Sequence, residues 1–118
     1  MRVLVCDDSM MFGALVEAWI ASDERFTHVG TADDGAGILR LAETTEADAL
    51  ILDLVLPDVD DVGELVAGLR ARRPQMRIVL LSSLPADELE IAARDAGADG
   101  FVHKMTSADQ LLGALLPA

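Results

Sequence analysis

The chain has 118 residues, of which 52% are hydrophobic and 25% charged, and its formal net charge is -12 at pH 7. This length and apolar content predict one globular domain over residues 1–118. The charge argues against direct nucleic-acid binding, because phosphate contacts need clustered Lys and Arg. No apolar run approaches the roughly 20 residues that cross a bilayer, and the first residues lack a signal-peptide pattern. We therefore expect a cytoplasmic protein with no membrane partner.

Short runs rich in aliphatic and β-branched residues alternate with stretches of helical periodicity along the chain. The first predicted strand is "RVLVC" at 2–6, which contains the single cysteine, Cys6, as a buried thiol. Further strands are predicted at 27–32, 49–53, 77–82 and 99–103. The predicted helices cover 9–22, 35–45, 61–73, 86–96 and 107–116. The pattern indicates five consecutive strand–helix units.

Strands that are apolar almost throughout are typical of a parallel sheet with helices on both faces. In such sheets ligands bind beyond the carboxyl ends of the strands. Four of the five predicted strands place polar groups at that edge, namely Asp7 and Asp8, Asp53, Ser82 with Ser83, and Lys104. We call this edge of the sheet the rim.

Three carboxylates that converge on the rim repel one another and lose hydration. A cation would relieve this, and oxygen ligands favour Mg²⁺ over zinc. Asp7 and Asp8 also have a simpler interpretation, because Asp and Ser often cap helices and Ser9 is another candidate cap. The presence of Asp53 and Lys104 at matching strand ends favours the metal site.

These residues together resemble a response-regulator receiver domain, the phosphoacceptor module of bacterial two-component signalling. The matching segments are "LVCDDS", "LILDLVLPDVD", "IVLLSS" and "GADGFVHK". The resemblance extends over the whole chain and implies an α/β, flavodoxin-like doubly wound sheet with strand order 2-1-3-4-5. Two departures are Met105, where the family often has proline, and Asp61, where the family usually has glycine. The segments "HKMTS" and "GADGF" are closest to the nitrate-regulator subgroup, whose receivers precede a helix-turn-helix DNA-binding domain.

The resemblance implies a role for each matching residue. Asp53 would accept a phosphoryl group from a sensor histidine kinase or a histidine phosphotransfer protein, assisted by Lys104 and Ser82. Mg²⁺ would be bound by Asp8 and Asp53, by Asp7 partly through water, and by the backbone carbonyl of Val55. The domain would catalyse only its own phosphorylation and dephosphorylation.

The resemblance also implies a switch. On phosphorylation Ser82 would move toward the phosphate and Phe101 would turn inward. This would repack the surface formed by the fourth helix, fifth strand and fifth helix, and a homodimer on phosphorylation fits the family. The output would be transcription through an attached domain, or the receiver would be free-standing.

The first predicted helix suggests a docking site. Residues 10–21, "MMFGALVEAWIA", contain one charged residue, Glu17, although a helix on a sheet should have a clear polar face. With Phe12, Val16, Trp19 and Ile20 facing inward, Met10, Met11 and Ala14 would remain at the surface. We hypothesise that the phosphoryl donor docks there.

Two other classes of protein also use residues of this kind. An aspartyl-nucleophile phosphatase usually has Asp-x-Asp at the end of a strand, but Leu54 and Val55 follow Asp53. A receiver-like interaction module that is not controlled by phosphorylation is favoured only by Asp61. The intact set of Asp7, Asp8, Asp53, Ser82 and Lys104 argues against this module.

Overall fold

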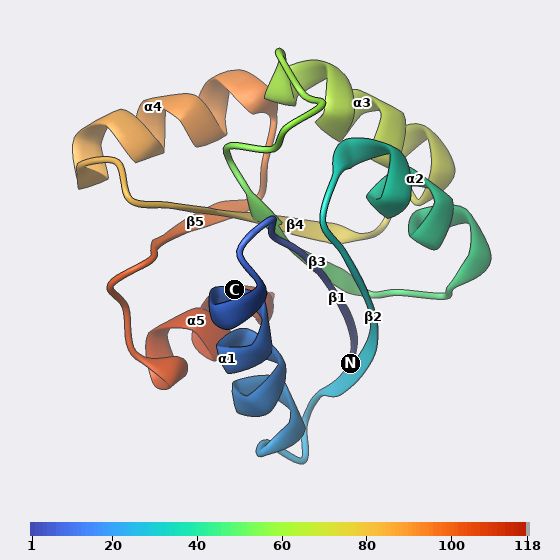
Figure 1. Cartoon of the computed structure of the whole chain (residues 1–118), viewed down its shortest axis with the longest axis vertical. Helices are drawn as coiled ribbons and strands as arrows, with labels where there is room; N and C mark the ends of the chain where they lie inside the picture. Colours follow the sequence, from blue (N-terminus) through green and yellow to red (C-terminus); the bar gives the residue numbers. More distant parts are fainter. Residues whose placement is uncertain (118) are drawn as a thin grey trace.

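A computed structural model describes residues 1–117 and alternates strands with helices along the chain (Figure 1). The strands are β1 (Arg2–Cys6), β2 (Thr27–Ala32), β3 (Ala49–Asp53), β4 (Arg77–Ser82) and β5 (Gly100–His103). The helices are α1 (Met10–Ala21), α2 (Gly35–Thr44), α3 (Val62–Arg72), α4 (Ala86–Ala96) and α5 (Ala108–Leu115). Every predicted element is present, and their ends differ from the predicted ends by at most one residue.

The strands form one parallel sheet in the order β2-β1-β3-β4-β5. Helices α2, α3 and α4 cover one face, while α1 and α5 cover the other (Figure 1). This is the predicted flavodoxin-like fold. Because the strands are parallel, the loops that follow them meet at one edge, which is the rim. Within the described residues no helix is long and apolar enough to cross a membrane.

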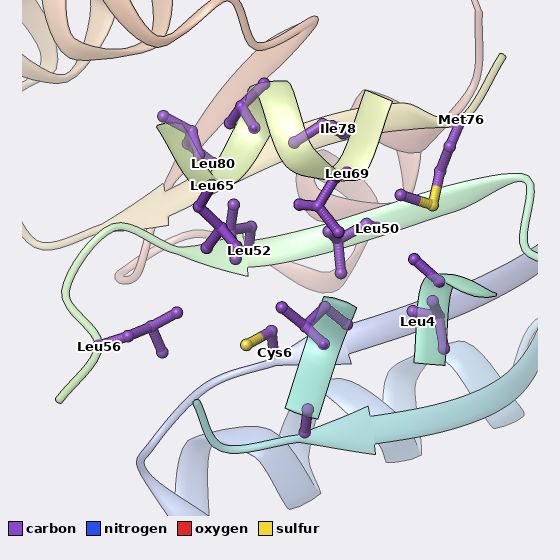
Figure 2. Packing of buried hydrophobic residues seen from close by; sticks show 14 of the residues in the cluster. Leu4, Cys6, Leu50, Leu52, Leu56, Leu65, Leu69, Met76, Ile78 and Leu80 are labelled. Atoms are coloured by element: carbon purple, nitrogen blue, oxygen red, sulfur yellow. The ribbon is translucent and has the colours of Figure 1, made fainter. Parts of the chain in front are cut away.

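Side chains alternate across the sheet and supply two separate hydrophobic layers. Leu50 and Leu52 of β3 point toward α2 and α3 (Figure 2). Leu65 and Leu69 of α3 and Ile78 of β4 belong to the same layer. Ala49 and Ile51 belong to the opposite layer, which includes Val16, Ile20 and Leu111. Each large buried side chain stabilises the fold by roughly 1.5–3 kcal/mol before entropic costs. The two layers hold the strand ends in fixed register at the rim.

Cys6 lies in the first of these layers, as predicted. Its thiol is 3.5 Å from the carbonyl oxygen of Asp34. Burial, followed by the charges of Asp53 and other carboxylates, raises the pKa of Cys6 well above its ordinary value. The thiol therefore stays protonated and is a packing group rather than a nucleophile.

Side-chain caps begin four of the five helices. Ser9, Asp34, Asp61 and Ser107 each accept a hydrogen bond from the backbone N–H three residues later. The Asp61 carboxylate caps α3 by accepting the Glu64 N–H at 3.3 Å. The positive end of the helix dipole stabilises this charge. Asp61 therefore offers no structural argument for an inert receiver-like module.

The loop after β3 is attached to the start of α2. Asp58 accepts hydrogen bonds from the backbone N–H groups of Gly35 and Ala36, at 2.7 and 3.1 Å. These two bonds hold the pKa of Asp58 below its ordinary value. Glycine at position 35 allows a close approach, because a Cβ there would lie 2.7 Å from Val59 Cγ2 and would have to displace that side chain. The two hydrogen bonds of Asp58 thus fix the path of the loop that follows Asp53.

Candidate functional site

The rim brings together the polar side chains predicted from the sequence. Asp7 directly follows β1, Asp53 and Ser82 are the last residues of β3 and β4, and Lys104 directly follows β5. Pairing of Asp53 with Leu81 and of Ser82 with His103 aligns these strand ends. The backbone N–H of Lys104 also donates to the Ser82 carbonyl at 2.9 Å. Lys104 is thus positioned by the sheet as well as by its side chain.

Asp7, Asp8 and Asp53 form a carboxylate cluster, in which one oxygen from each residue lies within 4.8 Å of the others. Asp7 and Asp53 are only 4% and 3% exposed, whereas Asp8 faces solvent. Asp7 Oδ1 accepts the Ser9 N–H at 2.8 Å. Asp7 Oδ2 is buried and has no hydrogen-bond partner among the described residues. An oxygen in that position needs a cation or a proton.

The Lys104 ammonium is the cation closest to this cluster. Its Nζ lies 3.1 Å from Asp53 Oδ2 and 3.5 Å from Asp7 Oδ2. Burial lowers the pKa of Lys104, but the hydrogen bond and charge of Asp53, with help from Asp7, raise it above its ordinary value. Lys104 is therefore charged at neutral pH. One ammonium cannot neutralise three carboxylates.

Neighbouring groups shift the pKa of Asp53 in opposite directions. Burial raises its pKa and Asp7 adds to this, while the Val55 N–H, 3.2 Å from Oδ1, and the Lys104 ammonium lower it. Burial is the largest effect, so the pKa of Asp53 lies above its ordinary value. A further cation would restore a lower pKa and keep Asp53 ionised.

The donor set fits a magnesium ion. Asp7, Asp8 and Asp53 offer hard carboxylate oxygens, the residual charge is negative, and Asp7 Oδ2 has no hydrogen bond beside its ion pair with Lys104 among the described residues. Mg²⁺ prefers such oxygens and retains several waters. A ligand role for the Val55 carbonyl stays a prediction.

Residues 3–116 match the response regulator receiver domain family. The chain belongs to this family. It is 36% identical over 115 residues to a protein-glutamate methylesterase/protein-glutamine glutaminase from Maricaulis maris, covering 96% of this chain but 28% of that protein. It is also 28% identical to the response regulator protein VraR of Staphylococcus epidermidis, covering 97% of this chain and 54% of VraR. The receiver therefore spans about half or less of the length of these relatives.

Solved structures agree with the family. The signal receiver domain of NarL from Mycobacterium tuberculosis superposes with a TM-score of 0.85 at 29% identity. The match covers 96% of this receiver and 90% of that chain. The predicted likeness to nitrate-regulator receivers is confirmed by this neighbour.

Ser82 and Phe101 occupy separate places in the receiver. Ser82 is buried, and its hydroxyl accepts the Leu84 N–H at 3.1 Å. It lines a pocket of about 410 Å³ together with Asp8, Asp53 and Lys104. Phe101 is 38% exposed and lines another pocket, with Leu89 of α4 and Gln110 of α5. The structure thus describes an outward Phe101, and its coupling to Ser82 stays a prediction.

His103 has a structural role that sequence reasoning missed. Its ring is half-buried and lies between two loops of the rim. Nε2 is 3.1 Å from the Ser83 carbonyl, and Nδ1 accepts the Met105 N–H at 3.0 Å. With Met105 in place of proline, the bond after Lys104 is trans, as are all peptide bonds of the described residues. His103 therefore ties the turn after Lys104 to the end of β4.

The exposure predicted for α1 is confirmed. Met10 and Met11 are 90% and 87% exposed and Ala14 also faces solvent, whereas Val16 and Ile20 are buried. Met10 and Ala14 line a groove of about 510 Å³ that continues to Asp7 and Asp8. The exposed residues Met10 and Ala14 of α1 thus share one groove with Asp7 and Asp8. A docking role for Met10, Met11 and Ala14 stays a prediction.

Proposed function

We propose that this receiver accepts a phosphoryl group on Asp53 in a Mg²⁺-dependent reaction. The donor is a phosphohistidine on a sensor histidine kinase or a histidine phosphotransfer protein. The proposal rests chiefly on one observation, namely that a single ammonium, Lys104 Nζ, lies within 3.5 Å of two buried carboxylates, Asp53 and Asp7. That arrangement suits a site in which negative charge is bound and transferred.

Asp53 is the nucleophile of the proposed reaction. A carboxylate oxygen of Asp53 attacks phosphorus, and the bond from phosphorus to the donor imidazole nitrogen breaks, leaving the electron pair on that nitrogen. Such transfers need positioning and charge neutralisation more than further covalent chemistry. Lys104 binds one phosphoryl oxygen, and the Ser82 hydroxyl rotates from the Leu84 N–H to donate to another. Mg²⁺, held by Asp7, Asp8 and Asp53, would neutralise the remaining phosphoryl charge.

The chemical test is a comparison of intact masses after incubation with acetyl phosphate and Mg²⁺. We expect wild type to gain one base-labile phosphoryl group, and Asp53→Asn to gain none because an amide is not a nucleophile. Chelating Mg²⁺ should abolish the adduct. Asp60→Asn, which removes an exposed acid from the loop after β3, is the matched control and should be phosphorylated normally. Unmodified wild type would instead support the receiver-like interaction module.

We further propose that the donor docks on the groove beside Met10, Met11 and Ala14. Met10 and Ala14 line this groove together with Asp7 and Asp8, so a partner seated on α1 would lie beside the two acids that neighbour Asp53. Methionine side chains adapt to different partner surfaces. We also propose that the domain acts in the cytoplasm and that phosphorylation changes the surface of α4, β5 and α5. This change would drive a homodimer or an attached transcriptional domain.

The docking proposal is tested by Met11→Lys. We expect transfer from the cognate phosphorylated partner to fall at least about tenfold, because a charge would be buried in an apolar contact. Phosphorylation by acetyl phosphate should be unchanged. Ile91→Lys on α4, which replaces another exposed apolar residue, is the control and should leave both rates unchanged. Undiminished transfer to Met11→Lys would contradict docking on α1.

A further inference from the structure

Phe12, in the first turn of α1, contacts the lysine of the site through the face of its ring. Lys104 Nζ lies 5.3 Å from the ring centroid, within the range of a cation–π interaction. The ring is half-buried and packs against the hydrophobic layer beneath α1 and α5. The aromatic face is therefore held still beside the ammonium.

The turn between β1 and α1 fixes Phe12 relative to the carboxylate cluster. Asp7 Oδ1 accepts the Ser9 N–H at 2.8 Å, and Ser9 Oγ accepts the Phe12 N–H at 3.3 Å. This short chain of hydrogen bonds joins Asp7, which pairs with Lys104, to Phe12, which stacks against it. One local turn thus supplies two of the three groups that surround the ammonium.

The ring is the only one of these three groups that the proposed chemistry leaves unchanged. Asp53 becomes an acyl phosphate and loses its carboxylate charge, and Asp7 would be one of the residues that hold Mg²⁺. Lys104 must then leave Asp53 Oδ2 for a phosphoryl oxygen while staying within the site. An aliphatic side chain at position 12 would fill the space but would present no negative face to the ammonium.

We propose that Phe12 is a positioning residue that holds the Lys104 ammonium in the site while its carboxylate partners change. This inference rests on the proposed phosphoryl transfer for its purpose, but its geometry can be tested without it. Phe12 acts through Lys104 and touches neither donor nor phosphate.

The geometric test is the NMR shift of the Lys104 ε-methylene protons, which a ring face moves upfield. We expect Phe12→Leu to remove this upfield shift. Phe26→Leu is the matched control, because Phe26 stacks in the same way under Arg25 at 5.3 Å, in the loop between α1 and β2. It should leave the Lys104 protons unchanged. Unchanged Lys104 protons in Phe12→Leu would overturn the proposal, whatever the outcome of phosphorylation.

The functional test compares rates of phosphorylation by acetyl phosphate at saturating Mg²⁺. We expect Phe12→Leu to be slower by roughly three- to tenfold, the range of a partly buried cation–π contact. Phe12→Tyr should retain most of the rate. A fluorinated phenylalanine at position 12, which keeps the shape but weakens the negative ring face, should be slow like leucine. Full activity of the fluorinated protein would show that only the shape of Phe12 matters and would overturn the proposal. Failure of wild type to be phosphorylated would refute the proposed function. The NMR comparison would then still decide whether Phe12 holds the Lys104 ammonium.

Discussion

Val55 and Leu84 place apolar side chains in the pocket beside Asp53. Both line the pocket that contains Asp53, Ser82 and Lys104, and Val55 is 69% exposed. Neither side chain can accept or donate a hydrogen bond. A water attacking the proposed phosphoaspartate would therefore find no side chain at these positions to orient it. Apolar groups here therefore favour a long-lived phosphate.

We predict that Val55→Asn shortens the phosphate half-life about tenfold, which corresponds to roughly 1.4 kcal/mol of barrier. The physical reason is that the amide can hold an attacking water near phosphorus. The measurement is the decay of the phosphorylated mass in the isolated domain after removal of the donor. Val55→Leu is the control and should decay like wild type. A wild-type half-life of only seconds would contradict the argument.

The C-terminal end of α3 is attached to the sheet by its arginines. In the "RARR" segment at 70–73, the guanidinium of Arg70 donates to the carbonyls of Met76 and Gly97 and to the carboxylate of Asp99. Asp99 also accepts the backbone N–H of Ile78 at 2.8 Å. These contacts connect α3, β4 and the loop before β5. The role of Arg70 is therefore structural, since it holds the end of α3 against the sheet.

We predict that Asp99→Ala destabilises the domain by about 1 to 2 kcal/mol, since it breaks two charge-assisted hydrogen bonds at a partly exposed site. Urea unfolding measures this loss. Asp33→Ala, at an exposed position in the loop after β2, is the control and should change stability by less than about 0.5 kcal/mol.

The same variant tests the pH dependence of stability. Burial raises the pKa of Asp99, but Arg70 and the Ile78 N–H outweigh it and hold that pKa below its ordinary value. A depressed folded-state pKa stabilises the fold above the unfolded pKa, about 3.9, and this contribution is lost as pH falls through the folded value. The stability difference between wild type and Asp99→Ala should thus be constant near neutral pH and shrink below about pH 4. A constant difference down to pH 2 would contradict this assignment.

The charges of the whole molecule are separated along the strand direction. Lys104 is the only Lys or Arg in the loops that follow the strands at the rim, which also contain Asp7, Asp8, Asp33, Asp34, Asp58, Asp60 and Asp61. Arg2 and Arg77 begin strands at the opposite edge, and Arg72 and Arg73 lie at the end of α3. Outside the immediate site the rim therefore repels anions.

We predict that this negative field slows phosphorylation by small anionic donors at low salt. Raising the ionic strength from about 10 mM to about 150 mM shortens the screening length from roughly 30 to 8 Å. Phosphorylation by acetyl phosphate at saturating Mg²⁺ should then accelerate several-fold. The combined variant Asp33→Asn with Asp60→Asn should respond less steeply. A rate that falls with salt would show that the donor is attracted rather than repelled.

Sequence reasoning identified the fold and most of the site because both depend on periodic or local signals. Five apolar runs predicted the strands, and the ends of those runs located Asp7, Asp53, Ser82 and Lys104. The parallel sheet then required these ends to meet. The exposure of Met10 and Met11 followed in the same way from the spacing of Val16 and Ile20 on one helix face.

Tertiary structure alone decided which distant groups touch. His103, for example, joins two loops that are distant in the sequence. The Phe12 ring meets Lys104, 92 positions along the chain, because both are placed by the packing of α1 and β5 on one sheet. A periodic pattern specifies which face a side chain occupies. Which residue that side chain contacts depends on how the helices and strands pack together, and this is decided by the whole chain.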